Sequence, residues 1–329
     1  MKRRKFLGSL GGAVVGCPLA ARGQQPRKPR SIAFVHSGFK ADALVETGGI
    51  FWIRRFYEEL RRLGYVEGRN LVVERHSAEG RSDRYAAVVA EVVSHKPDVI
   101  VSNQNSLVKA FVAATSTIPI VAITTDPVAS GLISSLARPG ANLTGVSVEA
   151  GPEIIAKRLQ LMKEALPSAA KVTYLFAGHH PDGIDAVARR LGMVVTESFL
   201  PQVDEGQLRR SFAHMAEQRT DAVLIDGSGS ILAFRALLIE LAAKARIPVV
   251  YPYRDYVEQG GLMAFAPDLG ELAERMASDV QQILNGAKAG EIPFYLPSRF
   301  QFIVNLKTAK TLGLSLPQTL VARADEVIE

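Results

Sequence analysis

The sequence predicts an α/β protein built from two doubly wound parallel-sheet lobes. After residue 30, short apolar runs rich in Val and Ile alternate with amphipathic segments of helical periodicity. Strands that are apolar throughout, with helices between them, are typical of parallel sheets covered on both faces. The alternation begins again near residue 150, and the 299 residues that follow residue 30 exceed the size at which a single core stops growing. We therefore expect two lobes of similar size.

The first half of the chain is expected to alternate between strand and helix. A helix over 51–63 is closed by Gly64, which suits the position that follows a helix C-terminus. The spacing of Tyr85, Val88 and Val92 predicts a second helix. The other expected elements are strands at 32–35, 71–74, 99–102, 120–123 and 144–148, and helices at 107–114 and 131–136.

The second half repeats this alternation without a convincing sequence repeat. Ile155, Leu159 and Met162 recur on one face of a predicted helix. The other expected elements are strands at 172–176, 193–196, 222–225 and 249–251, and helices at 184–191, 208–215 and 231–245.

Residues 1–23 have the features of an export signal of the twin-arginine kind. Arg3 and Arg4 precede a short apolar run over 6–15, and the small residues Ala21 and Gly23 then mark a cleavage point. This order of charged, apolar and small residues favours a signal peptide over an unordered basic tail. The apolar run is shorter than the roughly 20 residues that span a bilayer. We therefore expect a soluble protein delivered to the periplasm. Residues 24–30 are expected to form a linker between the leader and the first lobe.

Charge and cysteine content exclude several classes of function. The net charge of the whole chain is +6, but residues 1–23 contribute +5 of it, so the mature chain carries only +1 and nucleic-acid binding is not expected. The single cysteine, Cys17, lies in the leader, which excludes disulfides, thiol catalysis and Cys-ligated metals.

Two interpretations of Cys17 stay open. Residues 14–17 loosely resemble a lipoprotein box that would carry a lipid anchor, but Pro18 favours a passive cysteine.

The loops that follow the expected strands contain the candidate ligand-binding residues. Ligands of doubly wound sheets bind outside the carboxyl ends of the strands, and helix N-termini there attract anions. Tyr253 is suited to stacking on a planar ligand. Arg254 either pairs with a ligand carboxylate or forms a bridge to Asp255 or Glu258. The candidates are Ser37, Asn103, Asn105, Ser106 and Asp126 in the first half and His179, Asp226, Ser228, Tyr253 and Arg254 in the second.

Most of these Ser, Asn and Asp residues have an alternative interpretation as simple helix N-caps. Asp126 and Asp226 are the carboxylates that would face a ligand amine. Neither interpretation is excluded by the sequence.

The sequence lacks the common catalytic motifs, which favours a binding protein over an enzyme. The chain has no GxSxG elbow, no Walker A loop and no HExxH motif, and the turn at 226–230 lacks the third glycine of a dinucleotide fingerprint. The loop histidines are interpreted as ordinary loop residues and not as metal ligands, so no metal and no cofactor is expected.

The alternative is an exported two-lobed enzyme, hydrolase-like, which would need a nucleophile–base pair in the cleft. A regulator would need a DNA-binding motif before residue 31, where the leader stands.

Several segments resemble the periplasmic substrate-binding proteins of ABC transporters, of the tryptophan/tyrosine type. The resemblance is carried by LGYVEGRNLVVE (63–74), by the segments at 116–147 and 247–268, by the tail at 302–329 and by the leader. It implies the type I periplasmic-binding fold, with a three-segment hinge near 147–150, 264–267 and 294–299. It further implies a first lobe of 31–148 plus a returning helix at 268–290, and a second lobe of 149–266 plus 295–329.

The resemblance also implies a function. The protein would capture a small organic ligand, an amino acid or an aromatic or other organic acid, in the cleft between the lobes. Hinge closure around the ligand would then present it to the membrane permease of an ABC importer. The expected partners are this ligand and the permease, and the protein itself is expected to be a monomer.

Overall fold

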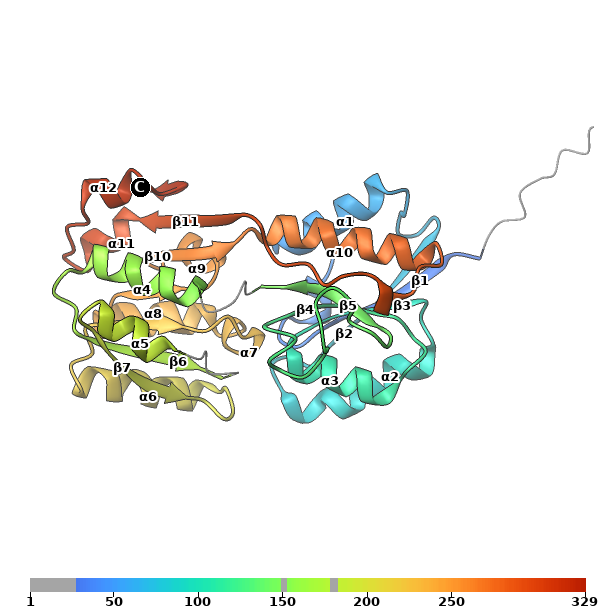
Figure 1. Ribbon diagram of the computed structural model, residues 1–329, viewed down its shortest axis with the longest axis horizontal. Helices are drawn as coiled ribbons and strands as arrows, with labels where there is room; N and C mark the ends of the chain where they lie inside the picture. Colours follow the sequence, from blue (N-terminus) through green and yellow to red (C-terminus); the bar gives the residue numbers. More distant parts are fainter. Residues whose placement is uncertain (1–27, 149–152, 178–182) are drawn as a thin grey trace, which may run out of the picture.

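The computed structural model describes residues 28–148, 153–177 and 183–329. Two α/β lobes lie side by side, each with its own sheet (Figure 1). The doubly wound, two-lobed fold expected from the sequence is confirmed. The predicted leader, Cys17, most of the linker and His179 lie outside the described residues. Within the described part of the chain, none of the helices is long and apolar enough to cross a bilayer.

The first lobe contains a five-stranded, fully parallel sheet in the order β2-β1-β3-β4-β5. One face packs against α1 (Phe51–Arg62) and α10 (Leu269–Leu284), and the other against α2 (Tyr85–His95) and α3 (Asn105–Ala114). The strands are β1 (Arg30–His36), β2 (Leu71–Ser77), β3 (Val99–Asn103), β4 (Ile120–Thr124) and β5 (Leu143–Ser147).

The second lobe contains a seven-stranded sheet in the order β12-β11-β10-β9-β8-β6-β7. Every pair is parallel except β10 with β11, which is antiparallel. Helices α6 and α8 cover one face, and α4 and α5 the other. The strands are β6 (Lys171–Phe176), β7 (Val194–Phe199), β8 (Ala222–Ile225), β9 (Val249–Tyr251), β10 (Met263–Pro267), β11 (Phe300–Asn305) and β12 (Glu326–Ile328). The helices are α4 (Glu153–Ala165), α5 (Ile184–Arg190), α6 (Glu205–Glu217), α7 (Gly229–Leu232), α8 (Arg235–Ala245), α9 (Arg254–Glu258), α11 (Leu306–Thr311) and α12 (Gln318–Val321).

The chain crosses between the lobes three times. It leaves the first sheet after β5, returns from β10 into α10, and crosses again before β11 (Figure 1). The third crossing is held on the first lobe by two backbone hydrogen bonds of Tyr295, whose N–H donates to Gly145 and whose carbonyl accepts from Ser147. Each lobe is therefore built from more than one stretch of the chain.

Helix α10 belongs to the first lobe although it follows β10 of the second. Its N-terminus is capped by Asp268, whose carboxylate accepts hydrogen bonds from the N–H groups of Gly270 and Glu271. Leu272, Met276 and the residues one turn apart from them bury an apolar face against α1 and the sheet. Leu272, Met276 and Ile283 recur at helical spacing in the sequence, so that spacing predicts the face that the structure buries.

Two local expectations were wrong. Residues 131–136 form no helix, because Gly131 has a φ of +70° and ends a turn that begins at Asp126. The single helix expected over 231–245 is two helices, α7 and α8, with a break before Arg235. The first residue of α7, Gly229, lies close to Ser37 and Asn103 of the first lobe.

Candidate functional site

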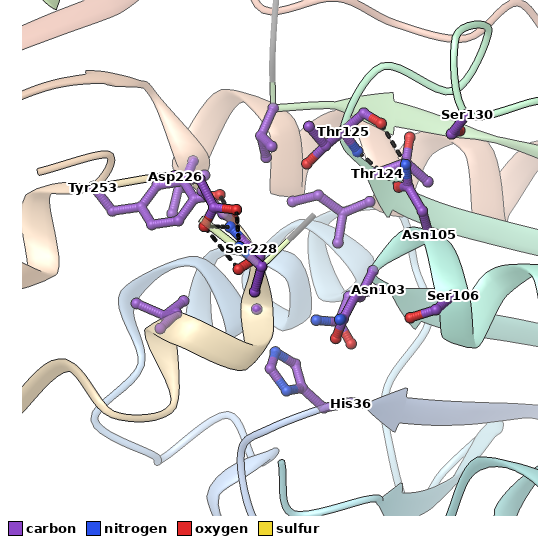
Figure 2. Close-up of a pocket in the computed structure, with 18 of the residues that line it drawn as sticks. His36, Asn103, Asn105, Ser106, Thr124, Thr125, Ser130, Asp226, Ser228 and Tyr253 are labelled. Carbon is purple, nitrogen blue, oxygen red and sulfur yellow. Dashed lines mark hydrogen bonds between the residues drawn. The ribbon is translucent and has the colours of Figure 1, made fainter. Parts of the chain in front are cut away.

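A cavity of about 460 Å³ lies between the two lobes and is lined by both of them. Its walls are the loops that follow β1, β3 and β4 in the first lobe and β6, β8 and β9 in the second (Figure 2). The polar and charged lining residues are His36, Asn103, Gln104, Asn105, Ser106, Lys109, Thr124, Thr125, Ser130, Asp226 and Ser228. The aromatic lining residues, apart from His36, are Trp52, Tyr174 and Tyr253.

Two asparagines fix the wall of the first lobe. The Asn103 Oδ1 atom accepts a hydrogen bond of 2.7 Å from the Ser37 N–H, and its Nδ2 donates to the Ser37 Oγ at 3.0 Å. The Asn105 Nδ2 donates a hydrogen bond of 2.5 Å to the Thr125 carbonyl oxygen, and its Oδ1 accepts one of 3.0 Å from the Thr125 N–H. These bonds join the carboxyl ends of β1, β3 and β4, so the wall is organised before any ligand arrives.

His36 lies at the end of β1 with its ring at the cavity (Figure 2). Its Nδ1 accepts hydrogen bonds from the N–H groups of Gly38, at 3.0 Å, and Phe39, at 2.8 Å. Burial lowers the pKa of His36 to about 3. The ring is therefore neutral at physiological pH, and because Nδ1 is an acceptor its proton resides on Nε2. His36 thus offers a hydrogen-bond donor without a charge.

The wall of the second lobe is built around Asp226. One carboxylate oxygen accepts a hydrogen bond of 3.0 Å from the Ala177 N–H. The other accepts from the N–H of Ser228 at 3.0 Å and from its Oγ at 2.8 Å (Figure 2). The Tyr253 hydroxyl donates to the Gly227 carbonyl at 2.6 Å. The loops after β6, β8 and β9 therefore hold one another in place.

The lobes touch beside this cavity at a pair of glycines. A Cβ atom on Gly229, the first residue of α7, would lie 2.9 Å from the Ser37 Oγ and 3.0 Å from the Asn103 Nδ2. A Cβ on Gly38 would lie 3.1 Å from both the Gly229 carbonyl oxygen and the Ala233 Cβ. Only residues without side chains allow the backbones to approach this closely.

The structure brings six of the ten predicted site residues together at the cavity: Asn103, Asn105, Ser106, Asp226, Ser228 and Tyr253. Ser37 lies directly behind them as the partner of Asn103. Asp126 is not among the lining residues, since its carboxylate closes its own turn by accepting from the Ala129 N–H. His179 is outside the described residues.

The placement of Arg254 corrects the expectation that it faces the ligand. Its guanidinium forms ion pairs with Glu258, one turn further along α9, and with Glu326 on β12. The side chain therefore points along the second lobe, and Arg254 does not line the cavity. Of the two alternatives left open by the sequence, the structure favours the bridge within the lobe.

Sequence reasoning missed several lining residues. Thr124 is the last residue of β4 and Thr125 follows it, so their position at a strand end was a signal. Lys109 lies one helical turn after Asn105, so helical spacing was the signal for Lys109. Trp52 and Tyr174 gave no such signal, because an aromatic residue in an apolar segment is ordinarily core.

The lining suits an organic solute better than a metal ion or a covalent reaction. The His36 Nδ1 and both oxygens of Asp226 already accept hydrogen bonds from the protein. What remains is a set of hydroxyl, amide and ammonium groups beside aromatic rings, together with the N-terminus of α3. These groups bind carboxylate and planar apolar parts of a small molecule.

Comparison with known proteins agrees with this geometry. The model of a family described as ABC transporter substrate binding protein matches residues 43–328. A tyrosine-binding protein of Clostridioides difficile (strain R20291) is 24% identical over 266 residues, covering 79% of this chain and 75% of its own.

Two solved structures share the fold, each with a TM-score of 0.81. A conserved domain protein of Vibrio cholerae is 24% identical, covering 91% of this chain and 100% of its own. An ABC domain of Streptococcus pneumonia in complex with L-Trp is 21% identical, covering 92% and 100%. The alternative of an exported hydrolase-like enzyme gains no support from these comparisons. The chain belongs to the family of ABC transporter substrate-binding proteins.

Proposed function

We propose that this protein is the periplasmic solute-binding component of an ABC importer and that it captures an amino acid or a related aromatic or organic acid. The observation that carries the proposal is the 460 Å³ cavity, whose two walls come from different lobes and present polar groups at strand ends. Such a volume lies within the range of small-molecule sites. A solute that contacts both walls favours the closed arrangement, which the permease then recognises.

The charges of the lining fit a zwitterion. A ligand carboxylate is expected beside Ser106 and Lys109, where the first turn of α3 contributes unpaired N–H groups. A ligand ammonium is expected near Asp226 on the opposite wall. Trp52 and Tyr253 supply apolar surface for a side chain between the two. The tyrosine-binding relative and the solved complex with L-Trp support an amino acid as the ligand class.

Calorimetric titration with a panel of amino acids, aromatic acids and sugars tests this assignment. We expect an amino or aromatic acid to bind and to be recovered chemically unchanged. Ser106→Ala should weaken a carboxylate ligand roughly tenfold or more, the loss for a hydrogen bond to a charged group. Arg254→Ala is the matched control, because its ion pairs lie outside the cavity. Preferential binding of a sugar, or an altered product, would contradict the proposal.

The location and assembly state are proposals as well. Members of this family act outside the cytoplasm, and residues 1–23 support export by the twin-arginine route. Replacing Arg3 and Arg4 by lysine should leave precursor in the cytoplasm, which cell fractionation would detect.

Because one chain supplies both walls of the cavity, a monomer is sufficient to bind the ligand. Light scattering of the purified protein measures its oligomeric state.

A further inference from the structure

A cluster of histidine and glutamate side chains lies on the first lobe, between β2 and α2. Glu74 and His76 are two residues apart on β2, so they project from the same face of that strand. Glu91 and His95 are four residues apart on α2, so they share one face of that helix. None of the four lines the ligand cavity. Strand and helix therefore direct two pairs of metal-binding side chains toward one another.

Three ligand atoms converge at the centre of this cluster. The His95 Nδ1 lies 2.7 Å from the Glu74 Oε2, and the His76 Nε2 lies 3.7 Å from the same oxygen. One ligand atom from each of Glu74, His76 and His95 lies within 4.8 Å of the other two. Ligand atoms in a tetrahedral zinc site, with bonds near 2.0–2.1 Å, are about 3.3 Å apart. Small side-chain rotations bring the three atoms to that spacing.

A second observation concerns the two ring nitrogens of His76. The Nε2 atom is buried and has no hydrogen-bond partner among the described residues, although it faces Glu74. A buried polar nitrogen without a partner calls for an explanation such as a missing ion. The other ring nitrogen, Nδ1, lies 3.5 Å from the Glu91 Oε1. A carboxylate on the far nitrogen holds its proton there and leaves the lone pair of Nε2 free to bind a metal.

We propose that this cluster binds a zinc ion through the Glu74 Oε2, the His76 Nε2 and the His95 Nδ1, with water in the fourth position. Glu91 is a positioning residue that orients the ring of His76. Two imidazoles and one carboxylate match the ligands zinc takes in open sites, whereas calcium and magnesium require oxygen ligands throughout. The half-exposed rim of the cluster, at His95, gives the ion an entry path. The bound ion would fasten β2, an edge strand, to α2.

The test is competition between the purified, chelator-treated protein and a chromophoric chelator for Zn²⁺ alone. We expect one tight equivalent in the wild type. His95→Gln and Glu74→Gln should each weaken zinc binding at least tenfold. Glu91→Gln should weaken it by a smaller factor than either, because Glu91 acts on the ring of His76 and not on the ion. Co²⁺ should give the visible absorption of a tetrahedral complex in the wild type and lose it in His95→Gln.

His214→Gln is the matched control, because His214 is an exposed histidine of the second lobe that lies 3.9 Å from Glu217. This variant should bind zinc as the wild type does. Circular dichroism and melting of the metal-free variants establish that each is folded. Zinc affinity in folded His95→Gln equal to that of His214→Gln would overturn the proposal and leave Glu74 as a simple hydrogen-bond partner of His95.

Discussion

At the scale of single residues, His36 makes the stability of the protein depend on pH. Its folded-state pKa of about 3 lies below the ordinary value of 6.5 because the ring is buried. Between those values the unfolded chain binds a proton that the native protein does not. Stability is therefore lost as the pH falls below 6.5, by about 2 kcal/mol at pH 5 from this group alone.

The prediction is that His36→Asn reduces this acid sensitivity. Asparagine keeps a neutral acceptor for the N–H groups of Gly38 and Phe39 but has no proton to gain. Denaturant titrations at pH 7.5 and pH 5 measure the free energy of unfolding of both proteins. The wild type should lose more of it on acidification than the variant does. An equal loss in both would show that His36 is not the group responsible.

Asp279 on α10 has the opposite dependence on pH. Its side chain is completely buried, and burial raises its pKa to about 7, with Arg275 opposing that shift. The native protein holds this proton where the unfolded chain has lost it, so stability falls as the pH rises from about 4 to 7. At pH 8 the buried charge costs roughly 2–4 kcal/mol.

We predict that Asp279→Asn raises the melting temperature at pH 8 and changes it little at pH 5. The amide removes the buried charge while keeping an oxygen near the Arg275 guanidinium, which lies 3.1 Å from the Asp279 Oδ1. Calorimetry at the two pH values separates the charge from any change in packing. A variant stabilised equally at both would show that packing, and not ionisation, is the cause.

At the scale of elements, the pairing of β4 with β5 in the first lobe leaves no room for a side chain at Gly145. Gly145 has a φ of +147°, and a Cβ atom there would lie 1.9 Å from the carbonyl oxygen of Ala122 on the neighbouring strand. Backbone atoms cannot move aside as a flexible side chain can. We predict that Gly145→Ala costs at least about 2–3 kcal/mol of stability, through strain and a disturbed strand pair.

Urea denaturation of Gly145→Ala measures that loss. The matched control is Gly49→Ala in the same lobe, where a Cβ would meet nothing within 4 Å. This control should unfold at the same urea concentration as the wild type. If Gly145→Ala matched Gly49→Ala, the two strands would be less closely paired than the structure shows.

Elements with a strong amphipathic period were predictable from the sequence, and those decided by one backbone conformation were not. Leu272 and Met276 mark the buried face of α10, and the structure confirms it. The helix expected over 131–136 failed because Gly131 takes a positive φ within a turn that Asp126 closes. Periodicity reports which face is buried, but it carries no information on φ.

The same limit applies to the site. Asn103 and Asp226 could be predicted to lie at the cavity because they stand at the carboxyl ends of strands, and the topology of a parallel sheet fixes where those ends lie. The direction of Arg254 depends on Glu258, one helical turn away, and also on Glu326, which is 72 residues away in the sequence. Such a long-range ion pair leaves no local pattern, so the sequence left two alternatives for Arg254.

At the scale of the whole molecule, the contact between Gly229 and the Ser37–Asn103 pair connects ligand binding to the arrangement of the lobes. The backbones meet there beside the cavity, so any side chain at position 229 would hold the lobes apart. The proposed ligand needs both walls. An obstacle at this contact should therefore weaken binding without removing a single group that touches the ligand.

We predict that Gly229→Val lowers ligand affinity at least tenfold, because closure must displace the Ser37 Oγ and the Asn103 Nδ2 from positions 2.9 and 3.0 Å from the new Cβ. The melting temperature without ligand should change little, since the obstacle acts between lobes that each have their own sheet. Gly49→Val is the matched control and should bind normally, because nothing lies within 4 Å of its Cβ. Solution scattering at saturating ligand should show a smaller radius of gyration in the wild type and the control, and no compaction in Gly229→Val. Full compaction of Gly229→Val would mean that the glycine contact does not limit closure.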